Sequence, residues 1–283
     1  MPLALFRRII QLKGFVYYTL HPSQAAGIAL SIHRRLGGSE NAFEGIRIVK
    51  AFAGLFDHYF EKLVTAYYPL DKLTEHLVEH AEMRNRALVE QAVLSDRGGI
   101  FLTGHFGAVE YIPVFFAINR LRPSIVLRFK TKNLRAALLR RARKLDIELI
   151  DADEGNVAFR ALKAVRSGRI LITLCDEFKH WRPSRDRRIS ILGCKAPSDR
   201  TLDILYQRSK APVFIGFMER NRSRVSLKVR TIADGGESIS ITEEACKILS
   251  KAIADRPEQW YQWRAFETEF RSYAEKANAH AAV

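Results

Sequence analysis

The sequence predicts an α/β protein in which helices flank a mostly parallel central sheet and a helical N-terminal region packs on that sheet. From residue 100 onward, short apolar runs typical of buried strands alternate with segments of helical periodicity. This alternation is the pattern of parallel strands joined by crossover helices. Residues 1–97 have an almost entirely helical pattern instead. We therefore expect a helical region at 1–97 and an α/β core at 98–283, joined in one continuous domain.

The helical region contains one segment with two interpretations. Residues 3–20 are apolar, but Arg7, Arg8 and Lys13 interrupt them, so no uncharged stretch reaches the roughly 20 residues that span a bilayer. An amphipathic helix lying on a membrane surface and an ordinary core helix fit this pattern equally well. Further along the chain, residues 71–96 predict a single long helix that ends at a pair of glycines.

The elements of the core can be assigned in chain order. Buried strands are expected at 100–103, 125–129, 147–150, 170–174 and 213–218. Helices are expected at 133–144, 154–167, 198–210 and 242–254. Asp153 and Ser198 are the expected N-caps of the second and third of these helices. Residues 224–232 alternate between apolar and polar side chains, which predicts an antiparallel strand at the edge of the sheet.

The charge of the chain is strongly unbalanced. It has 46 Lys and Arg against 31 Asp and Glu, a net charge of +15, which favours anionic partners. Residues 120–144 contain ten Lys and Arg and no acidic residue. This run is either a solvated surface or an anion-binding rim beside a functional site. Nucleic acid is not an expected partner, because the sequence has no nucleic-acid-binding motif and no basic stripe interleaved with aromatic residues.

The cysteines and the missing motifs exclude several classes of protein. Cys175, Cys194 and Cys246 form no Cys-x-x-Cys pair, which favours a reducing compartment and argues against a disulfide framework or a zinc site. There is no Walker loop, no dinucleotide-binding glycine motif and no Gly-x-Ser-x-Gly elbow. Because Cys175 ends an apolar strand, we interpret it as a buried small residue and not as a nucleophile.

The most informative segment, 104–110, directly follows the first strand of the core. His105 and Glu110 are separated by four residues, and Gly104 and Gly107 lie on either side of the histidine. A neutral imidazole can take a proton from a hydroxyl, and a carboxylate can fix its tautomer. A His and a Glu at this spacing are usually a structural pair, but the strand end and the glycines favour a site. Side chains five positions apart diverge by about 140° on a helix, so His105 must lie in the loop and Glu110 in the first helical turn.

This segment resembles the late acyltransferases of lipid A assembly, the lauroyl and myristoyl transferases, within the wider lysophospholipid acyltransferase group. Those proteins have an apolar strand, a small residue and then His-x4-Glu or His-x4-Asp. Three further pieces follow in the order of the family: a strand ending in Arg128, a strand ending in Asp176, and Pro-Glu-Gln-Trp at 257–260. Arg143 has the spacing of a second arginine of the family. The resemblance covers most of the chain.

The resemblance implies a role for each matching residue. His105 would be the general base that deprotonates the acceptor hydroxyl, and Glu110 would orient it. Arg128 and Arg143 would bind a phosphate of the acceptor or of the donor's phosphopantetheine arm, and Asp176 would hold one of these arginines. Backbone amides beside the histidine would stabilise the oxyanion, and the acyl group would transfer directly, without a covalent enzyme intermediate.

We therefore expect an O-acyltransferase that moves a fatty acyl chain from a thioester of acyl carrier protein or coenzyme A to a hydroxyl of a lipid or lipid-like acceptor. The implied partners are acidic acyl carrier protein or a CoA thioester, an anionic lipid acceptor and a membrane surface, with no metal and no cofactor beyond the co-substrate. The implied location is peripheral, on the cytoplasmic face of the inner membrane. Two alternatives stay open: a thioester or ester hydrolase that uses the same His-Glu pair, and a non-catalytic module that binds membranes or carrier protein.

Overall fold

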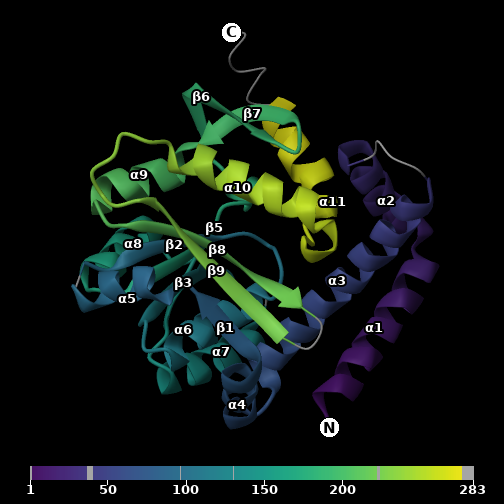
Figure 1. Cartoon of the computed structure of the whole chain (residues 1–283), viewed down its shortest axis with the longest axis horizontal. Coiled ribbons are helices and arrows are strands. Elements are labelled where there is room, and N and C mark those ends of the chain that lie inside the picture. The colour runs from purple at the N-terminus through teal and green to yellow at the C-terminus, as the bar shows by residue number, and fades with distance from the viewer. Residues whose placement is uncertain (1, 37–40, 96, 130, 222–223, 276–283) are drawn as a thin grey trace.

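A seven-stranded sheet forms the centre of the molecule, in the order β1-β9-β8-β2-β5-β3-β4 (Figure 1). The computed structural model describes residues 2–36, 41–95, 97–129, 131–221 and 224–275. The strands of this sheet are β1 (Ala81–Arg84), β2 (Gly99–Thr103), β3 (Pro123–Leu127), β4 (Glu148–Asp151), β5 (Ile170–Leu174), β8 (Val213–Asn221) and β9 (Arg224–Ala233). All pairings are parallel except that of β8 with β9, so the predicted mostly parallel sheet is confirmed.

Helices cover both faces of the sheet, as the alternation of strands and helices requires. The core on one face includes residues of α4 (Leu70–His80), α5 (Arg86–Leu94) and α6 (Ile112–Ile118). The core on the other face includes residues of α8 (Val157–Arg166), α9 (Arg200–Ser209) and α10 (Ile241–Asp255). Strand β2 contributes Phe101 to the first core and Ile100 and Leu102 to the second, because successive side chains of a strand point to opposite faces.

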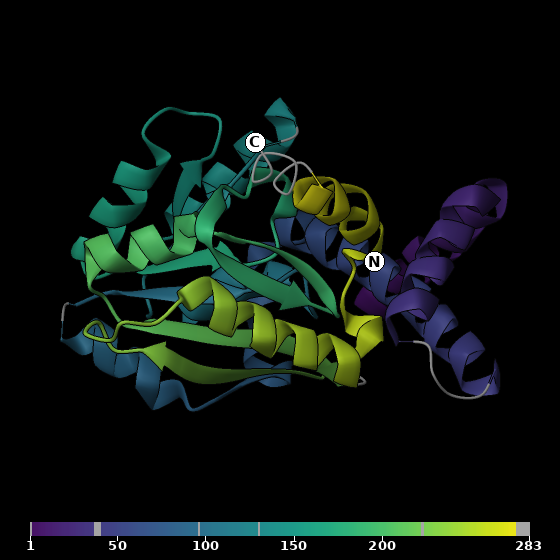
Figure 2. The ribbon, with the colours of Figure 1, turned by 90° about the horizontal axis from the view of Figure 1, so that it is seen from above.

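The N-terminal helices are α1 (Leu3–Leu20), α2 (Pro22–Leu36) and α3 (Asn41–Tyr67). Figures 1 and 2 show α1 and α2, in purple, at one side of the α/β body. Helix α3 joins them to it, because α3 packs against α1 and also against the loops that follow β2 and α10. Arg7 on α1 forms an ion pair with Asp57 on α3, with Nε 2.6 Å from Oδ1. No helix in the described ranges is both long and apolar enough to cross a membrane.

The predicted helix at 71–96 is wrong, because a strand interrupts it. Strand β1 lies between α4 and α5 and pairs with β9. Asn85 then takes a left-handed conformation (φ 61°) and its side-chain amide donates to the carbonyl of Val229, which turns the chain into α5. Because β1 covers β9, the antiparallel strand predicted at 224–232 is not at the edge of the sheet. Residues before 98 therefore contribute to the sheet of the core.

Two predicted helices begin later than expected, and one hairpin was not predicted. Helix α8 begins at Val157, after Asn156 in a left-handed conformation, and Asp153 does not cap it. The β-hairpin β6 (Pro183–Ile191) and β7 (Cys194–Asp199) extends through the predicted cap Ser198, so Asp199 caps α9 instead by accepting from the amide of Thr201. The hairpin turn at 192–193 has two positive φ angles, 47° and 78°, a geometry that only its glycine signals in the sequence.

Candidate active site

His105 lies in the loop after β2, next to the end of the neighbouring strand β5. The amide of Cys175 donates to the carbonyl of Thr103 over 2.8 Å, which continues the pairing of the two strands past their ends. His105, two residues after Thr103, then lies close to Asp176, which follows Cys175: the backbone N–H of His105 donates to both oxygens of the Asp176 carboxylate, at 3.1 and 3.0 Å. Cys175 itself is fully buried, as predicted, and burial holds the pKa of its thiol well above the ordinary value.

The imidazole of His105 and the carboxylate of Asp176 form a hydrogen-bonded dyad. Nδ1 of the ring is 2.9 Å from Oδ1, and the indole N–H of Trp260 donates to Oδ2 over 2.8 Å. The Asp176 side chain has no exposed surface. By accepting a hydrogen bond from Nδ1, this carboxylate fixes a proton on that nitrogen and leaves Nε2 as the nitrogen that can exchange a proton with a substrate.

Glu177 occupies the other side of the ring. Its Oε1 lies 3.3 Å from Nε2 of His105, and its side chain is 44% exposed against 13% for the histidine, so this side of the ring faces the surface. Burial alone would lower the pKa of His105, but the charges of Asp176 and Glu177 outweigh burial and raise this pKa to about 10. Burial likewise opposes ionisation of Glu177, but the hydrogen bond to His105 outweighs it and lowers the pKa of Glu177. The site as it stands therefore contains an imidazolium between two carboxylates.

Glu110 lies where the sequence places it, but the orienting carboxylate is a different one. His105 is in the loop and Glu110 in the first turn of the short helix η1 (Val109–Tyr111), as predicted. The Glu110 carboxylate lies 3.8 Å from Nδ1 of His58 on α3. Both ring nitrogens of His105 face the carboxylates at the end of β5, so Asp176 holds the position that we had assigned to Glu110.

An aromatic ring connects the two histidines. The ring of Tyr261 stands edge-on to His105, with centroids 5.2 Å apart, and stacks on His58 at 3.6 Å. The amide of Tyr261 donates to the carbonyl of His105 over 3.2 Å. Glu110 is thus connected to the site through two aromatic rings: it lies next to His58 of α3, His58 stacks on Tyr261, and Tyr261 packs against His105.

Arg128 joins the site from the next strand, β3. Its Nε is 2.6 Å from Oδ1 of Asp153, and its Nη1 lies 2.6 Å from Nε2 of His180. The expectation that Asp176 would hold an arginine is therefore corrected for this arginine: Asp153 holds Arg128, and Asp176 holds His105. The charge of Arg128 contributes to the lowered pKa of Glu177, so the guanidinium is within electrostatic reach of the dyad.

Arg143 does not join this group. Helix α7 (Lys132–Lys144) begins near the edge at which β3 ends and runs back toward the edge at which β4 begins. A helix of 13 residues is about 20 Å long, and Arg143 is exposed in its last turn. His105 follows the opposite edge of the sheet, so the structure separates Arg143 from the dyad.

The backbone amides beside His105 are already engaged. The four N–H groups of residues 105–108 all donate within the protein, so the expected oxyanion-stabilising amides are not available in this loop as it stands. Their acceptors are the side chain of Asp176 and the carbonyls of Gly104, Gln259 and Met218. The loop is held in place by these bonds instead.

A buried ion pair also contacts the loop that follows His105 and stabilises it. Arg220 at the end of β8 donates to both carboxylate oxygens of Glu61 on α3, over 2.6 and 2.8 Å, and also to the carbonyl of Gly107 over 2.7 Å. Gly107 has φ +63°, and a side chain there would meet the carbonyl oxygen of Met218 at 2.0 Å, so only glycine fits this close approach to β8. The pair therefore fixes the path of the chain just after His105.

Three residues that contact the dyad were not predicted as site residues: Glu177, Trp260 and Tyr261. Glu177 and Tyr261 carried no recognised signal, and Trp260 was noted only for its place in a sequence signature. Asp176 was noted at a strand end, and two neighbouring parallel strands would bring His105 and Asp176 together. That signal needed the sheet order, with β5 next to β2, which the sequence does not state.

The described residues were also searched for a metal site and for cavities that could hold a substrate. In the described part of the chain, no group of three or more His, Cys, Asp or Glu side chains could hold a metal ion. Two surface cavities are lined by α3, α4 and α7 and by residues around α4 to α6, and His105 lines neither. Comparison of the chain with protein-family models and with curated proteins gives no match.

Proposed function

We propose that the protein is an O-acyltransferase that transfers a fatty acyl chain from a thioester, on acyl carrier protein or coenzyme A, to a hydroxyl of a lipid or lipid-like acceptor. The observation that carries this proposal is the His105–Asp176 dyad, with Nδ1 held and Nε2 directed toward the partly exposed Glu177. A histidine held in this way by a buried carboxylate is the arrangement that general-base catalysis uses. The resemblance of the surrounding motifs to lipid acyltransferases supports the choice of reaction.

Catalysis begins when the acceptor hydroxyl replaces Glu177 at Nε2 of His105. Departure of that carboxylate removes one of the two charges that raise the pKa of the ring, so the ring can then release its Nε2 proton to solvent and become neutral. Asp176 remains in place and keeps the tautomer that leaves Nε2 free to accept a proton. Glu177 lies within electrostatic reach of Arg128, which can balance its charge in the displaced position.

Acyl transfer then follows in two proton movements. Nε2 takes the hydroxyl proton as the oxygen attacks the thioester carbonyl, so a carbon–oxygen bond forms and the carbonyl oxygen becomes negative. Collapse of this intermediate breaks the carbon–sulfur bond, and the imidazolium returns its proton to the departing thiolate. Asp176 stabilises the imidazolium throughout. We assign Arg128, which lies within electrostatic reach of Glu177, to a phosphate of the donor or the acceptor.

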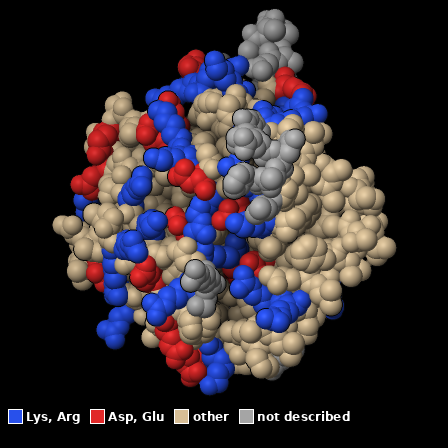
Figure 3. Space-filling view, turned by 45° about the vertical axis from the view of Figure 1, so that its right-hand side comes forward, with Lys and Arg blue, Asp and Glu red and all other residues tan. Residues whose placement is uncertain are grey.

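Attachment to a membrane surface fits the position of α1. None of its residues is buried, which disfavours the core-helix interpretation. Six large hydrophobic side chains on it are exposed: Leu5, Leu12, Phe15, Val16, Tyr17 and Leu20. Figure 3 shows a broad uncharged surface on the side of the molecule where the N-terminal helices lie. A peripheral location at the cytoplasmic face of the inner membrane would bring this surface to the acceptor lipid, and the net charge of +15 suits anionic lipids and an acidic carrier protein.

The test compares lipids by mass spectrometry in cells with and without the protein, and in cells with His105→Gln. We expect an acyl ester that is present with the wild-type protein and absent in both other strains. A free fatty acid released without any new ester would identify the hydrolase alternative. An ester pattern that His105→Gln leaves unchanged would point to the non-catalytic alternative and overturn the proposal.

A further inference from the structure

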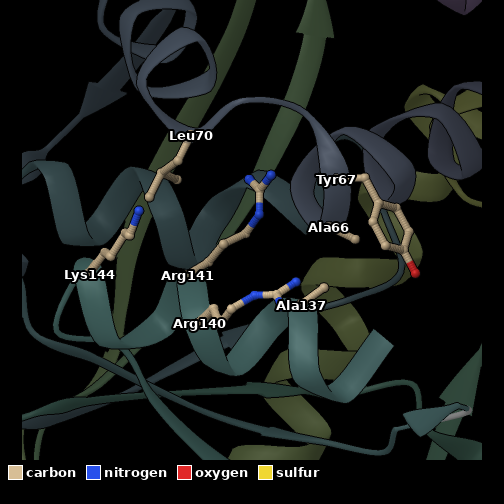
Figure 4. A pocket seen from close by; sticks show the side chains of 7 residues that line it. All are labelled: Ala66, Tyr67, Leu70, Ala137, Arg140, Arg141 and Lys144. Atoms are coloured by element: carbon tan, nitrogen blue, oxygen red, sulfur yellow. The ribbon is translucent and has the colours of Figure 1, made fainter. Parts of the chain in front are cut away.

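A cluster of cations on α7 lines a cavity that the proposed reaction does not use. The cavity has a volume of about 280 Å3 and lies between α7 and the junction of α3 with α4. Arg140, Arg141 and Lys144 line it from α7, and Tyr67 and Leu70 line it from the junction. Figure 4 shows the three cationic side chains in the gap between α7 and this junction. Small-molecule sites begin at about this size, so the space suits a headgroup or a small ligand.

Arg141 has a buried hydrogen-bond donor that indicates a ligand site. Its Nη2 donates to the carbonyl of Tyr68, which anchors the guanidinium at the wall of the cavity. Its Nη1 is buried from solvent, and among the described groups it has no hydrogen-bond partner. A buried donor without an acceptor costs free energy, more so on a charged group, and an anion in the cavity would remove this cost. Burial also lowers the pKa of Arg141.

The other two cations have no carboxylate to neutralise them. In the part of the chain that the structure describes, no Asp or Glu forms an ion pair with Arg140, Arg141 or Lys144. Arg140 and Lys144 are four positions apart on the same helix, where like charges repel. Elsewhere on α7 the structure does satisfy a cation, since Arg135 pairs with Glu154. The face of α7 that lines the cavity therefore carries three positive charges without an acidic partner among the described residues.

We infer that this cavity binds a phosphate group, held by the guanidinium fork of Arg141 and by the charges of Arg140 and Lys144. A phosphate monoester offers up to two negative charges and several acceptor oxygens, which match two guanidinium groups and an ammonium group. The inference rests on no part of the catalytic proposal.

The position of the cavity favours a phosphate carried by an amphiphile. Leu3 and Phe6 of α1 pack on the core that also contains Val64 near the end of α3, so α1 reaches the end of α3 that lines the cavity. Leu5, in the same part of α1, is one of its exposed apolar side chains. Thr65, one residue before the lining residues of α3, donates to the carbonyl of Glu110 over 3.4 Å, which connects the cavity to the loop after His105.

The test measures binding by calorimetry at constant ionic strength, with the full chain. The probes are inorganic phosphate, monomeric dihexanoyl phosphatidic acid and, as the zwitterionic control, dihexanoyl phosphatidylcholine. We expect phosphatidic acid to bind, and Arg141→Gln to weaken it by roughly tenfold or more, because a charged hydrogen bond is lost. Arg140→Ala with Lys144→Ala, both at exposed positions, should weaken it similarly without disturbing the anchor to Tyr68.

The matched control is Arg208→Ala, which removes one exposed positive charge from α9, away from the cavity, and should change the affinity less than about twofold. Binding of inorganic phosphate within about tenfold of phosphatidic acid would show that the phosphate alone is recognised, whereas binding of phosphatidic acid alone would show that the lipid carries it. The inference is overturned if the wild-type protein binds neither probe, or if the double variant binds as tightly as Arg208→Ala. Neither result would affect the acyl-transfer assay.

Discussion

The loop at the ends of β2 and β5 and the cavity-lining face of α7 arrange charge in opposite ways. At the first, His105 lies between Asp176 and Glu177, and the nearby Arg128 pairs with Asp153. At the second, three cations line a cavity (Figure 4), and no Asp or Glu among the described residues forms an ion pair with them. In the first region each cation lies beside a carboxylate, and Asp176 holds one tautomer of His105. The second keeps its charge available for a ligand and contributes to the net charge of +15.

The largest expected effect comes from removing the base in the first region. His105→Gln should lower kcat/KM for acyl transfer by about 10²- to 10⁴-fold, because the acceptor hydroxyl loses its general base. The melting temperature should stay within a few degrees, since the amide side chain can still bond to Asp176. Steady-state kinetics and thermal unfolding of the same preparation check both parts. A variant that keeps most of its activity would remove the dyad from the mechanism.

The buried ion pair of Arg220 with Glu61, next to the first region, should contribute more to stability than an exposed ion pair does. Arg220→Met leaves Glu61 buried without its partner and should lower the free energy of unfolding by about 3–5 kcal/mol. The control, Arg135→Met, breaks an exposed pair with Glu154 and should cost less than about 1 kcal/mol. Urea unfolding measures both. Equal losses of unfolding free energy in the two variants would mean that the pair of Arg220 with Glu61 stabilises the protein no more than an exposed pair does.

The pH dependence of activity can distinguish the effect of Glu177 on His105 from that of Asp176. Activity needs the neutral ring, and the charge of Glu177 helps to hold the pKa of His105 at about 10. Glu177→Gln removes that charge, so the pKa should fall and the pH profile of kcat/KM should move toward lower pH, with higher activity at neutral pH. The exposed change Glu75→Gln on α4 is the control and should leave the profile in place. A profile that does not move would show that Glu177 has no influence on the ring in the working enzyme.

The smallest effect is expected at Arg143, which the resemblance assigns to phosphate binding and the structure places at the far end of α7. Arg143→Ala should change stability by no more than about 0.5 kcal/mol, as for other exposed positions, and should leave KM for the thioester donor nearly unchanged. Kinetics at varied donor concentration decide the matter. A large rise in KM would restore the role that the sequence motif suggests.

The sequence predicted the strands of the core well because they are apolar on both faces, and Gly99–Thr103 and Ile170–Leu174 are the clearest cases. It failed at β1, where Ala81–Arg84 has no strand pattern of its own and depends on β9 as a partner. In the site, too, local features were predicted and contacts between distant segments were not. His105 and the turn at Glu110 were visible locally, whereas the pairing of His105 with Asp176 depends on which strands are neighbours.

The most direct test of the central claim is acyl transfer by the purified protein. A radiolabelled acyl thioester is incubated with vesicles of extracted membrane lipid and either the wild-type protein or Asp176→Asn, and the labelled products are separated and identified. With the wild-type protein we expect label in a new lipid ester, and with Asp176→Asn a loss of most of that ester, because the ring of His105 no longer has a carboxylate to hold its tautomer and stabilise its charge. Equal ester formation by the folded variant, or label only in free fatty acid, would contradict the account.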